Sequence, residues 1–172
     1  MKDISRNVRD VIERYGWYVV HIHHDVLHPC PRCMQYGEGK EANPRCPVCL
    51  GFGARVQVRP IKVRNTSAAR PNYNELEETD IGILGNQDQL YYCLPEAEIC
   101  EGDYLVEVTW NVPTERVALR GQVLIAHKAY EANRVEPKHG DHGELSYYRT
   151  SVHAIDLDTT WLLHVLTHRP VA

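Results

Sequence analysis

The chain has 172 residues, of which 43% are hydrophobic and 24% are charged, and its formal net charge at pH 7 is -4. This length allows one ordinary domain with a small appendage, and the hydrophobic content is sufficient for a core. No stretch of the sequence is long and apolar enough to cross a membrane, and Met1–Arg6 lack the apolar core of a signal peptide. We therefore expect a protein without a membrane segment, in a compartment that keeps thiols reduced.

Charge is unevenly distributed along the chain. Residues 29–64 carry seven Lys and Arg against two Glu, whereas residues 65–172 carry eight Lys and Arg against seventeen Asp and Glu. A basic segment on an acidic body favours charge-guided docking on another protein, or a weak contact with nucleic acid. A solvated surface loop is the alternative explanation of the same pattern.

The N-terminal segment predicts a short amphipathic helix followed by a strand. Apolar residues recur at helical spacing over residues 3–15, and Gly16 ends the pattern. Residues 17–23 are aromatic and β-branched, which predicts a strand that leads into a cysteine-rich segment, and residues 55–59 predict a second strand that leaves it. The cysteine-rich segment is therefore predicted to be the tip of a long β-hairpin.

Two CPxC pairs separated by twelve residues are the most specific chemical signal in the chain; their cysteines are Cys30, Cys33, Cys46 and Cys49. Each CxxC turn directs two sulfurs at one point, and two turns supply the closed tetrahedron of a structural zinc site. Zinc would clamp the loop 34–45, whose glycines and charges could not fold alone. Two disulfides, or thiols that only fill a core, are the alternatives. We interpret Cys93 and Cys100, which lack this spacing, as ordinary thiols.

Several histidines could act as metal ligands or as catalytic groups. His23 and His28, near the first cysteine pair, could replace a cysteine ligand or form a second site. His139, Asp141 and His142 could form a metal or general-base site, but the glycines around them describe a turn more economically. Because the chain has no GxSxG, HExxH or phosphate-loop motif, we expect a protein that is not an enzyme.

The second half of the chain predicts an antiparallel β structure. Residues 65–80 contain little that could be buried and are predicted to be a linker or an exposed loop. Short strand-like runs punctuated by Gly, Pro, Asn and Asp follow at residues 90–94, 104–110, 116–126, 130–135, 147–153 and 161–166. The predicted fold class is mainly β (α+β), a small antiparallel β-barrel with an N-terminal amphipathic helix and a zinc-clamped β-hairpin arm. The predicted blocks are 1–28 for the helix and first strand, 29–64 for the arm and 65–172 for the barrel.

Three stretches within residues 76–153 carry a resemblance to a known family: Gln89–Pro95, Ile99–Val106 and Tyr130–Pro137. A strand that ends near proline, an "I..GD" turn that opens the next strand, and a strand that starts with Tyr and ends near Pro occur in this order. They resemble the head-closure (stopper) proteins of tailed bacteriophages. Those proteins usually lack a cysteine block, so the arm would be an addition.

The resemblance implies a structural virion protein that is assembled in the cytoplasm of a bacterial host. It implies a homo-oligomeric ring in the head-tail neck, in contact with portal or adaptor proteins and with tail proteins. Such a ring helps to retain the packaged genome, so a passive contact with DNA is also implied. The zinc arm would then grip a neighbouring subunit or ring.

Two other interpretations fit parts of the sequence. Cys46–Gly53 is similar to one CxxCxGxG repeat of DnaJ-type chaperones, but those carry four repeats and an HPD motif, so we expect only the geometry of the knuckle to be shared. A nucleic-acid-binding zinc-ribbon protein is the alternative function, with Tyr36 or Phe52 stacking on bases, although the acidic body argues against it. Its phosphate contacts would be Arg32, Lys40, Arg45, Arg55, Arg59, Lys62 and Arg64.

Overall fold

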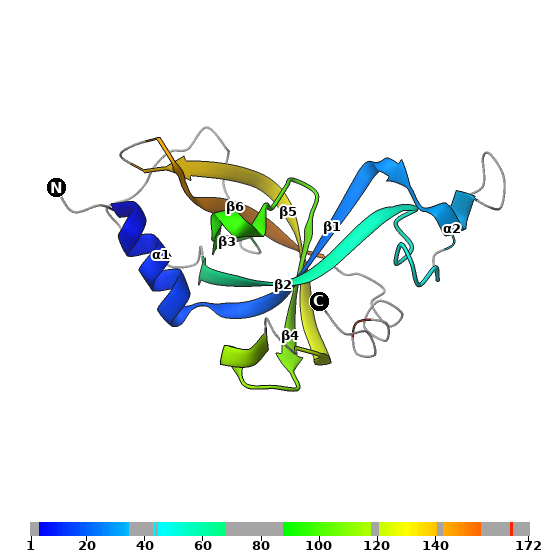
Figure 1. Ribbon diagram of the computed structural model, residues 1–172, viewed down its shortest axis with the longest axis horizontal. Helices are drawn as coiled ribbons and strands as arrows, with labels where there is room; N and C mark the ends of the chain where they lie inside the picture. Colours follow the sequence, from blue (N-terminus) through cyan, green and yellow to red (C-terminus); the bar gives the residue numbers. More distant parts are fainter. Residues whose placement is uncertain are drawn as a thin grey trace.

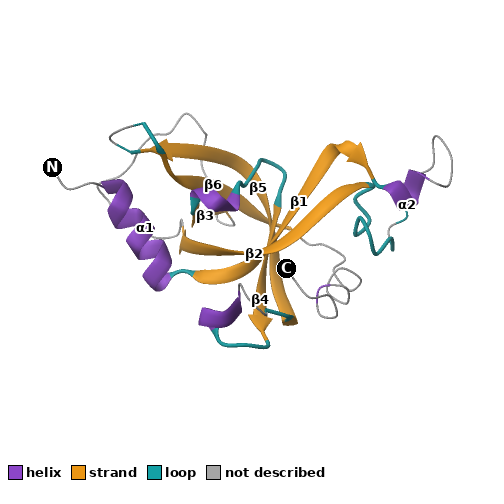
Figure 2. Cartoon of the chain, in the orientation of Figure 1, coloured by secondary structure: helices purple, strands orange, loops and turns teal. Residues whose placement is uncertain are grey.

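The computed structural model describes residues 4–34, 43, 45–67, 88–117, 121–140, 143–155 and 166. This part of the chain is mainly β (Figures 1 and 2). The helices are α1 (Ile4–Tyr15) and α2 (Pro31–Met34), with 3₁₀ turns at Pro95–Ala97 and Thr114–Arg116. The strands are β1 (Trp17–Pro29), β2 (Ala54–Ser67), β3 (Asp88–Cys93), β4 (Tyr104–Trp110), β5 (Val123–His139) and β6 (Leu145–Ile155).

The six described strands form one antiparallel sheet whose order, β1-β2-β3-β6-β5-β4, closes on itself. Closure depends on β1, which pairs with β2 over most of its length and with β4 from Val20, opposite Val106, to Ile22, opposite Tyr104. Beyond Ile22, β1 and β2 continue together as a hairpin arm with α2 at its tip (Figure 1). The predicted mainly β fold with an N-terminal helix is therefore confirmed.

All six strands contribute to one apolar interior. Side chains alternate between the two faces of a strand, so the residues of each strand that share a face meet inside the closed sheet. Two tyrosine rings lie at its centre, Tyr91 and Tyr130, with their centroids 5.6 Å apart. The other buried members are Val19, Ile61, Val63, Cys93, Ala97, Ile99, Leu105, Ala132 and Val152.

A second apolar cluster covers the outer face of β1, β4 and β5. Val20, Ile22 and Val106 contribute from the sheet, and Leu50 and Leu166 cover them from outside. Phe52 packs against the same cluster, stacked on Tyr104 with ring centroids 5.0 Å apart. Because Leu50 and Phe52 follow the second cysteine pair, this cluster attaches the arm to the body.

Helix α1 lies against the opposite end of the sheet from the arm (Figure 1). Gly16 follows the helix directly, and only glycine fits there because a Cβ would lie 2.3 Å from the carbonyl oxygen of Ile12 and 2.7 Å from that of Val63. Lys62 donates to the carbonyl of Glu13, and Arg64 donates to that of Tyr15 at 3.0 Å. These two cations of β2 therefore satisfy the last carbonyls of the helix, a favourable position for positive charge.

The strand predictions differ from the structure in two places. The predicted strand 116–126 is wrong over its first part: Thr114–Arg116 form a 3₁₀ turn, and β5 begins only at Val123. The predicted strand 130–135 is the middle of β5, which runs through register shifts to His139. The predicted strand 161–166 lies outside the described residues except for Leu166, which is helical and buried.

The predicted blocks do not correspond to separate parts of the sheet. Strand β1 continues past residue 28 and β2 continues past residue 64, and both belong to the closed sheet. Residues 65–172 therefore supply four of its six strands together with the end of β2. The predicted linker at 65–80 begins inside β2, which ends at Ser67, and residues 68–80 lie outside the described residues.

Candidate metal centre

The first cysteine pair lies where β1 ends. Cys30 follows Pro29 directly, and its N–H donates to the carbonyl of Gly53 at 2.8 Å, which closes the end of the hairpin. The short helix α2 then carries Cys33 one turn further. A proline at the first helical position suits this turn, because its missing N–H would have had no partner there.

The second pair lies in a turn that returns the chain to β2. The N–H of Cys46 donates to the carbonyl of Asn43 at 2.9 Å, and the N–H of Phe52 donates to that of Cys49 at 2.9 Å. Leu50 and Gly51 have φ angles of 55° and 90°. Such left-handed backbone favours glycine, so Gly51 allows the sharp reversal after Cys49.

The four sulfurs gather at one point. The Sγ atoms of Cys30 and Cys46 are 3.9 Å apart, and those of Cys33 and Cys49 are 3.6 Å apart. All four lie within 4.8 Å of one another, so the cluster could hold a metal ion. A tetrahedron with metal-sulfur bonds of about 2.3 Å has sulfurs about 3.8 Å apart, close to these values. Disulfide sulfurs are only about 2.05 Å apart, so the geometry fits a shared ion and not two disulfides.

The backbone prepares this cluster for thiolate ligands. Burial acts to raise the pKa of Cys46, but hydrogen bonds from the backbone of Cys49 and Val48 outweigh it and lower the pKa to about 7. Burial raises the pKa of Cys49. Cys30, Cys46 and Cys49 are buried, and Cys33 is half-buried. A bound cation would favour the thiolate form of these cysteines.

His23 and His28, predicted as possible replacement ligands, do not join the cysteines. His28 is exposed and hydrogen-bonds to Oδ2 of Asp25 on its own strand. His23 lies at the base of the arm, where its Nδ1 donates to Oδ1 of Asp103 at 2.8 Å. Among the described residues, the metal cluster at the arm tip consists of the four cysteines alone.

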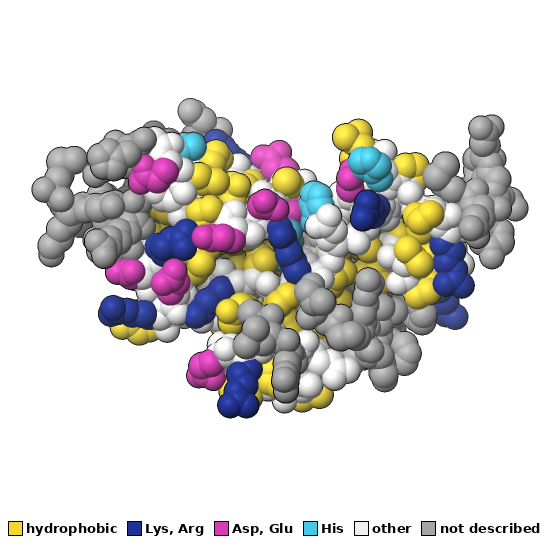
Figure 3. All heavy atoms as spheres, viewed as in Figure 1, with side chains coloured by type: hydrophobic (Ala, Val, Ile, Leu, Met, Phe, Trp, Pro, Cys, Tyr) yellow, Lys and Arg dark blue, Asp and Glu magenta, His cyan; other side chains and the backbone are white. Residues whose placement is uncertain are grey.

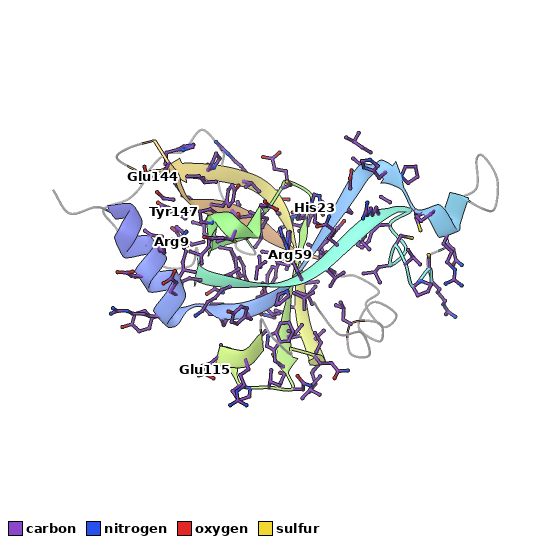
Figure 4. The ribbon with its side chains drawn as sticks, viewed as in Figure 1. Arg9, His23, Arg59, Glu115, Glu144 and Tyr147 are labelled. Carbon is purple, nitrogen blue, oxygen red and sulfur yellow. The ribbon has the colours of Figure 1, made fainter. Side chains whose placement is uncertain are left out.

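A second polar cluster, which sequence reasoning missed, lies where the arm leaves the body (Figure 4). His21 is fully buried, and its Nε2 donates to Oδ2 of Asp103 at 2.7 Å. Arg59, opposite His21 on β2, donates from Nε to Nδ1 of His21 at 3.4 Å and from Nη2 to the carbonyl of Ala97. Because Arg59 donates to Nδ1, the proton on His21 resides on Nε2.

Asp103 is the centre of this second cluster. Its side chain is 1% exposed and accepts hydrogen bonds from both histidines and from the N–H of Cys100 at 2.8 Å. Burial acts to raise the pKa of Asp103, but the hydrogen bonds from His21 and Cys100 outweigh it and hold the pKa below its usual range. The available sequence signal was the spacing of His21 and His23, since residues two apart share one face of a strand.

Of the remaining sequence candidates, His139 and Cys93 lie apart from both clusters. His139 ends β5, and its Nδ1 donates to the carbonyl of Gly143 at 3.0 Å, whereas Asp141 and His142 lie outside the described residues. Cys93 is buried in the interior, and burial raises its pKa to about 12. Cys100 is exposed and lies beside Asp103, in the second cluster.

No protein-family model matches the chain, and a search of curated proteins finds no significant match to it. Within the described part of the chain, no helix has the length and apolar character needed to cross a bilayer.

Proposed function

We propose that this chain is a non-enzymatic structural protein of a tailed-phage virion, a subunit of a ring in the head-tail neck. The fold supports this proposal because two of the three stretches that carry the resemblance to head-closure proteins meet in space. The N–H of Gly102 donates to the carbonyl of Ala132, and the N–H of Ala132 donates to that of Asp103, each at 2.8 Å. The "I..GD" turn is thereby held against the middle of β5, and the closed sheet serves as the barrel of the ring subunit.

Zinc is the proposed metal of the arm. Four cysteine ligands from two CxxC turns suit Zn²⁺, which is tetrahedral in structural sites, and the sulfur separations agree with that geometry. The described arm tip has little apolar core apart from the cysteines themselves. A bound ion contributes folding free energy to such a segment, with apparent values of about 10–16 kcal/mol in zinc-finger peptides.

The observation that carries the role of the arm is a bulge in β1. The β1-β2 register shifts between Asp25 and Pro29, and Asp25 accepts from the N–H of Leu27 at 3.1 Å and contacts His28. This bulge leaves Val26 and Leu27 72% and 82% exposed. Bulges re-aim side chains, and two adjacent exposed aliphatic residues suit a protein partner better than phosphate.

The basic residues of the arm divide into two groups. Arg59, Lys62 and Arg64 are engaged within the body, on His21 and on the end of α1. The described cations left exposed on the arm are Arg32, Arg45 and Arg55. Figure 3 shows dark-blue cations next to yellow hydrophobic side chains on this part of the molecule. Arginine is enriched at protein interfaces, and we propose an acidic surface of a neighbouring neck protein as the partner.

Electron microscopy of the purified protein, or of the virion that contains it, tests this function. We expect a homo-oligomeric ring with a pore wide enough for duplex DNA, located between portal or adaptor proteins and tail proteins. A chain that stays monomeric at all concentrations and binds DNA in a salt-dependent manner would instead support the zinc-ribbon alternative.

The arm itself is tested by Val26→Asp with Leu27→Asp. Both side chains are already in water, so the fold and the metal content should be unchanged while affinity for the neck partner falls at least tenfold. Leu124→Asp with Ile125→Asp is the matched control, because it adds the same charge at an exposed apolar pair on β5. Equal partner affinity in wild type and the arm variant would rule out this contact.

A further inference from the structure

The second polar cluster has three potential metal ligands on its solvent side. His23, Cys100 and Asp103 each offer one donor atom, and these atoms lie within 4.8 Å of one another. His23 comes from β1, whereas Cys100 and Asp103 come from the turn before β4. The cluster lies one residue beyond Ile22, the last residue of β1 that pairs with β4. Its ligands therefore join the base of the arm to the body.

The carboxylate of Asp103 is already held in a fixed orientation. Its Oδ2 accepts from Nε2 of His21 at 2.7 Å and from the N–H of Cys100 at 2.8 Å. Arg59 in turn holds His21 through Nδ1. Outer hydrogen bonds of this kind orient the ligands of protein metal sites. Only Oδ1 remains directed toward His23, so the buried side of the cluster positions one oxygen for an ion.

Small movements convert this arrangement into a coordination sphere. Zinc bonds of about 2.0–2.3 Å place nitrogen and oxygen ligands about 3.3 Å apart, and nitrogen and sulfur ligands about 3.6 Å apart. Nδ1 of His23 and Oδ1 of Asp103 are now 2.8 Å apart around a shared proton. Replacing that proton by an ion needs the two atoms to separate by about 0.5 Å, and the exposed Cys100 side chain needs to move by about 1.2 Å at most.

We propose that His23, Cys100 and Asp103 form a second metal site, which binds one divalent ion of the zinc class. Binding releases the thiol proton of Cys100 to solvent, while the proton on Nδ1 of the His23 imidazole moves to Nε2 and frees Nδ1 for the ion, so one proton is released per ion bound. One thiolate, one imidazole and one carboxylate are all ligands that zinc accepts. Three protein ligands leave a fourth position for water, unlike the closed four-cysteine cluster. This site is independent of the proposed neck function.

Metal titration of the full chain with Co²⁺, followed by elemental analysis after Zn²⁺ exchange, tests the proposal. We expect two equivalents per chain in wild type and one in Cys33→Ser, because that variant disrupts only the arm cluster. Adding Cys100→Ala or His23→Gln to Cys33→Ser should remove the remaining equivalent and its sulfur-to-cobalt absorption. His28→Gln is the matched control, since His28 is an exposed histidine of the same strand that contacts only Asp25 among the described groups.

A thermal melt identifies the variants that remain folded, and only the metal content of those variants tests the proposal. A folded Cys33→Ser chain that binds no metal would overturn the proposal, and so would an equivalent that persists in both double variants. If the four-cysteine cluster binds no metal but the second site does, the titration gives a different result. In that case wild type would bind one equivalent that is insensitive to Cys33→Ser and sensitive to Cys100→Ala.

Discussion

The closed sheet and the arm share two strands, yet different interactions stabilise them. In the body, residues from all six strands surround a common interior, and Tyr91, Leu105 and Val152 are fully buried there. In the described part of the arm tip, the buried cluster consists of cysteines. Full burial of an aliphatic or aromatic side chain contributes about 1.5–3 kcal/mol, so the body can be stable on packing alone. The arm tip has no comparable interior, which is why we expect its order to depend on a metal.

The largest expected effect concerns the body. A chain that begins at Glu75 lacks β1 and β2 and leaves the facing edges of β3 and β4 unpaired. We expect it to lose the cooperative thermal transition, as followed by circular dichroism. Deleting residues 26–54 and joining Asp25 to Arg55 through Asn-Gly should retain that transition, because these two residues are already paired. A cooperative melt of the first chain would show that residues 75–172 fold without the hairpin.

Metal removal is expected to affect the arm more than the body. Cys33→Ser removes one of the four thiolates, so this variant should lose one zinc equivalent by elemental analysis. Limited proteolysis should then cut within residues 30–53, while the strands of the closed sheet stay protected. Cys93→Ser changes a buried thiol of the interior and should leave the metal content unchanged. Similar cleavage of Cys33→Ser and wild type would argue against an arm that is ordered by metal.

Substitutions in the apolar contact between the arm and the body are expected to have an intermediate effect on the free energy of unfolding. Phe52→Ala removes a ring that stacks on Tyr104 and on His24, so we expect it to cost about 2 kcal/mol, less than a fully buried phenylalanine. Urea denaturation measures this change. Phe52→Leu retains most of the apolar contact and should cost less than half as much. Equal costs for the two variants would mean that the stacking does not contribute.

The smallest expected effect is electrostatic and belongs to the body. Glu136 on β5 accepts from Lys138 at 2.8 Å and pairs with Arg134 at 3.1 Å. The hydrogen bond from Lys138 outweighs burial and lowers the pKa of Glu136. A lowered pKa in the folded state stabilises the protein above the unfolded pKa of about 4.3, and this contribution is lost as pH falls.

Glu136→Gln should therefore cost about 0.5–1 kcal/mol at pH 7 and less below pH 4, as measured by denaturation at both values. Glu144→Gln, a change at an exposed carboxylate of the same half of the sheet, is the control. A cost for Glu136→Gln that does not change with pH would contradict the electrostatic explanation.

Local patterns predicted those elements that depend on nearby residues. The periodicity of residues 3–15 predicted α1, and the aromatic and β-branched run at 104–110 predicted β4 with its observed bounds. The CxxC spacing predicted which four cysteines meet. In each case the signal and its structural consequence lie within a few residues of each other, so periodicity or spacing is sufficient.

Long-range features could not be predicted in the same way. The sequence of β5 was divided into two predicted strands, 116–126 and 130–135, yet the structure has one strand whose register shifts accommodate the irregular stretch. Asp103 lies 80 residues from His23 in the sequence, so only closure of the sheet brings them together. The basic residues of β2 were assigned to one surface, but Lys62 and Arg64 contact α1, a pairing that no local pattern encodes.

The continuity of β1 and β2 from the body into the arm has a mechanical consequence. A force applied to the cysteine turns acts along the two strands and loads their ladders with β4 and β3 in shear, so many hydrogen bonds resist together. The bulge between Asp25 and Pro29 interrupts the ladder between the two arm strands and is the place where the ribbon bends most easily. We therefore expect the arm to bend at this bulge, beside Val26 and Leu27.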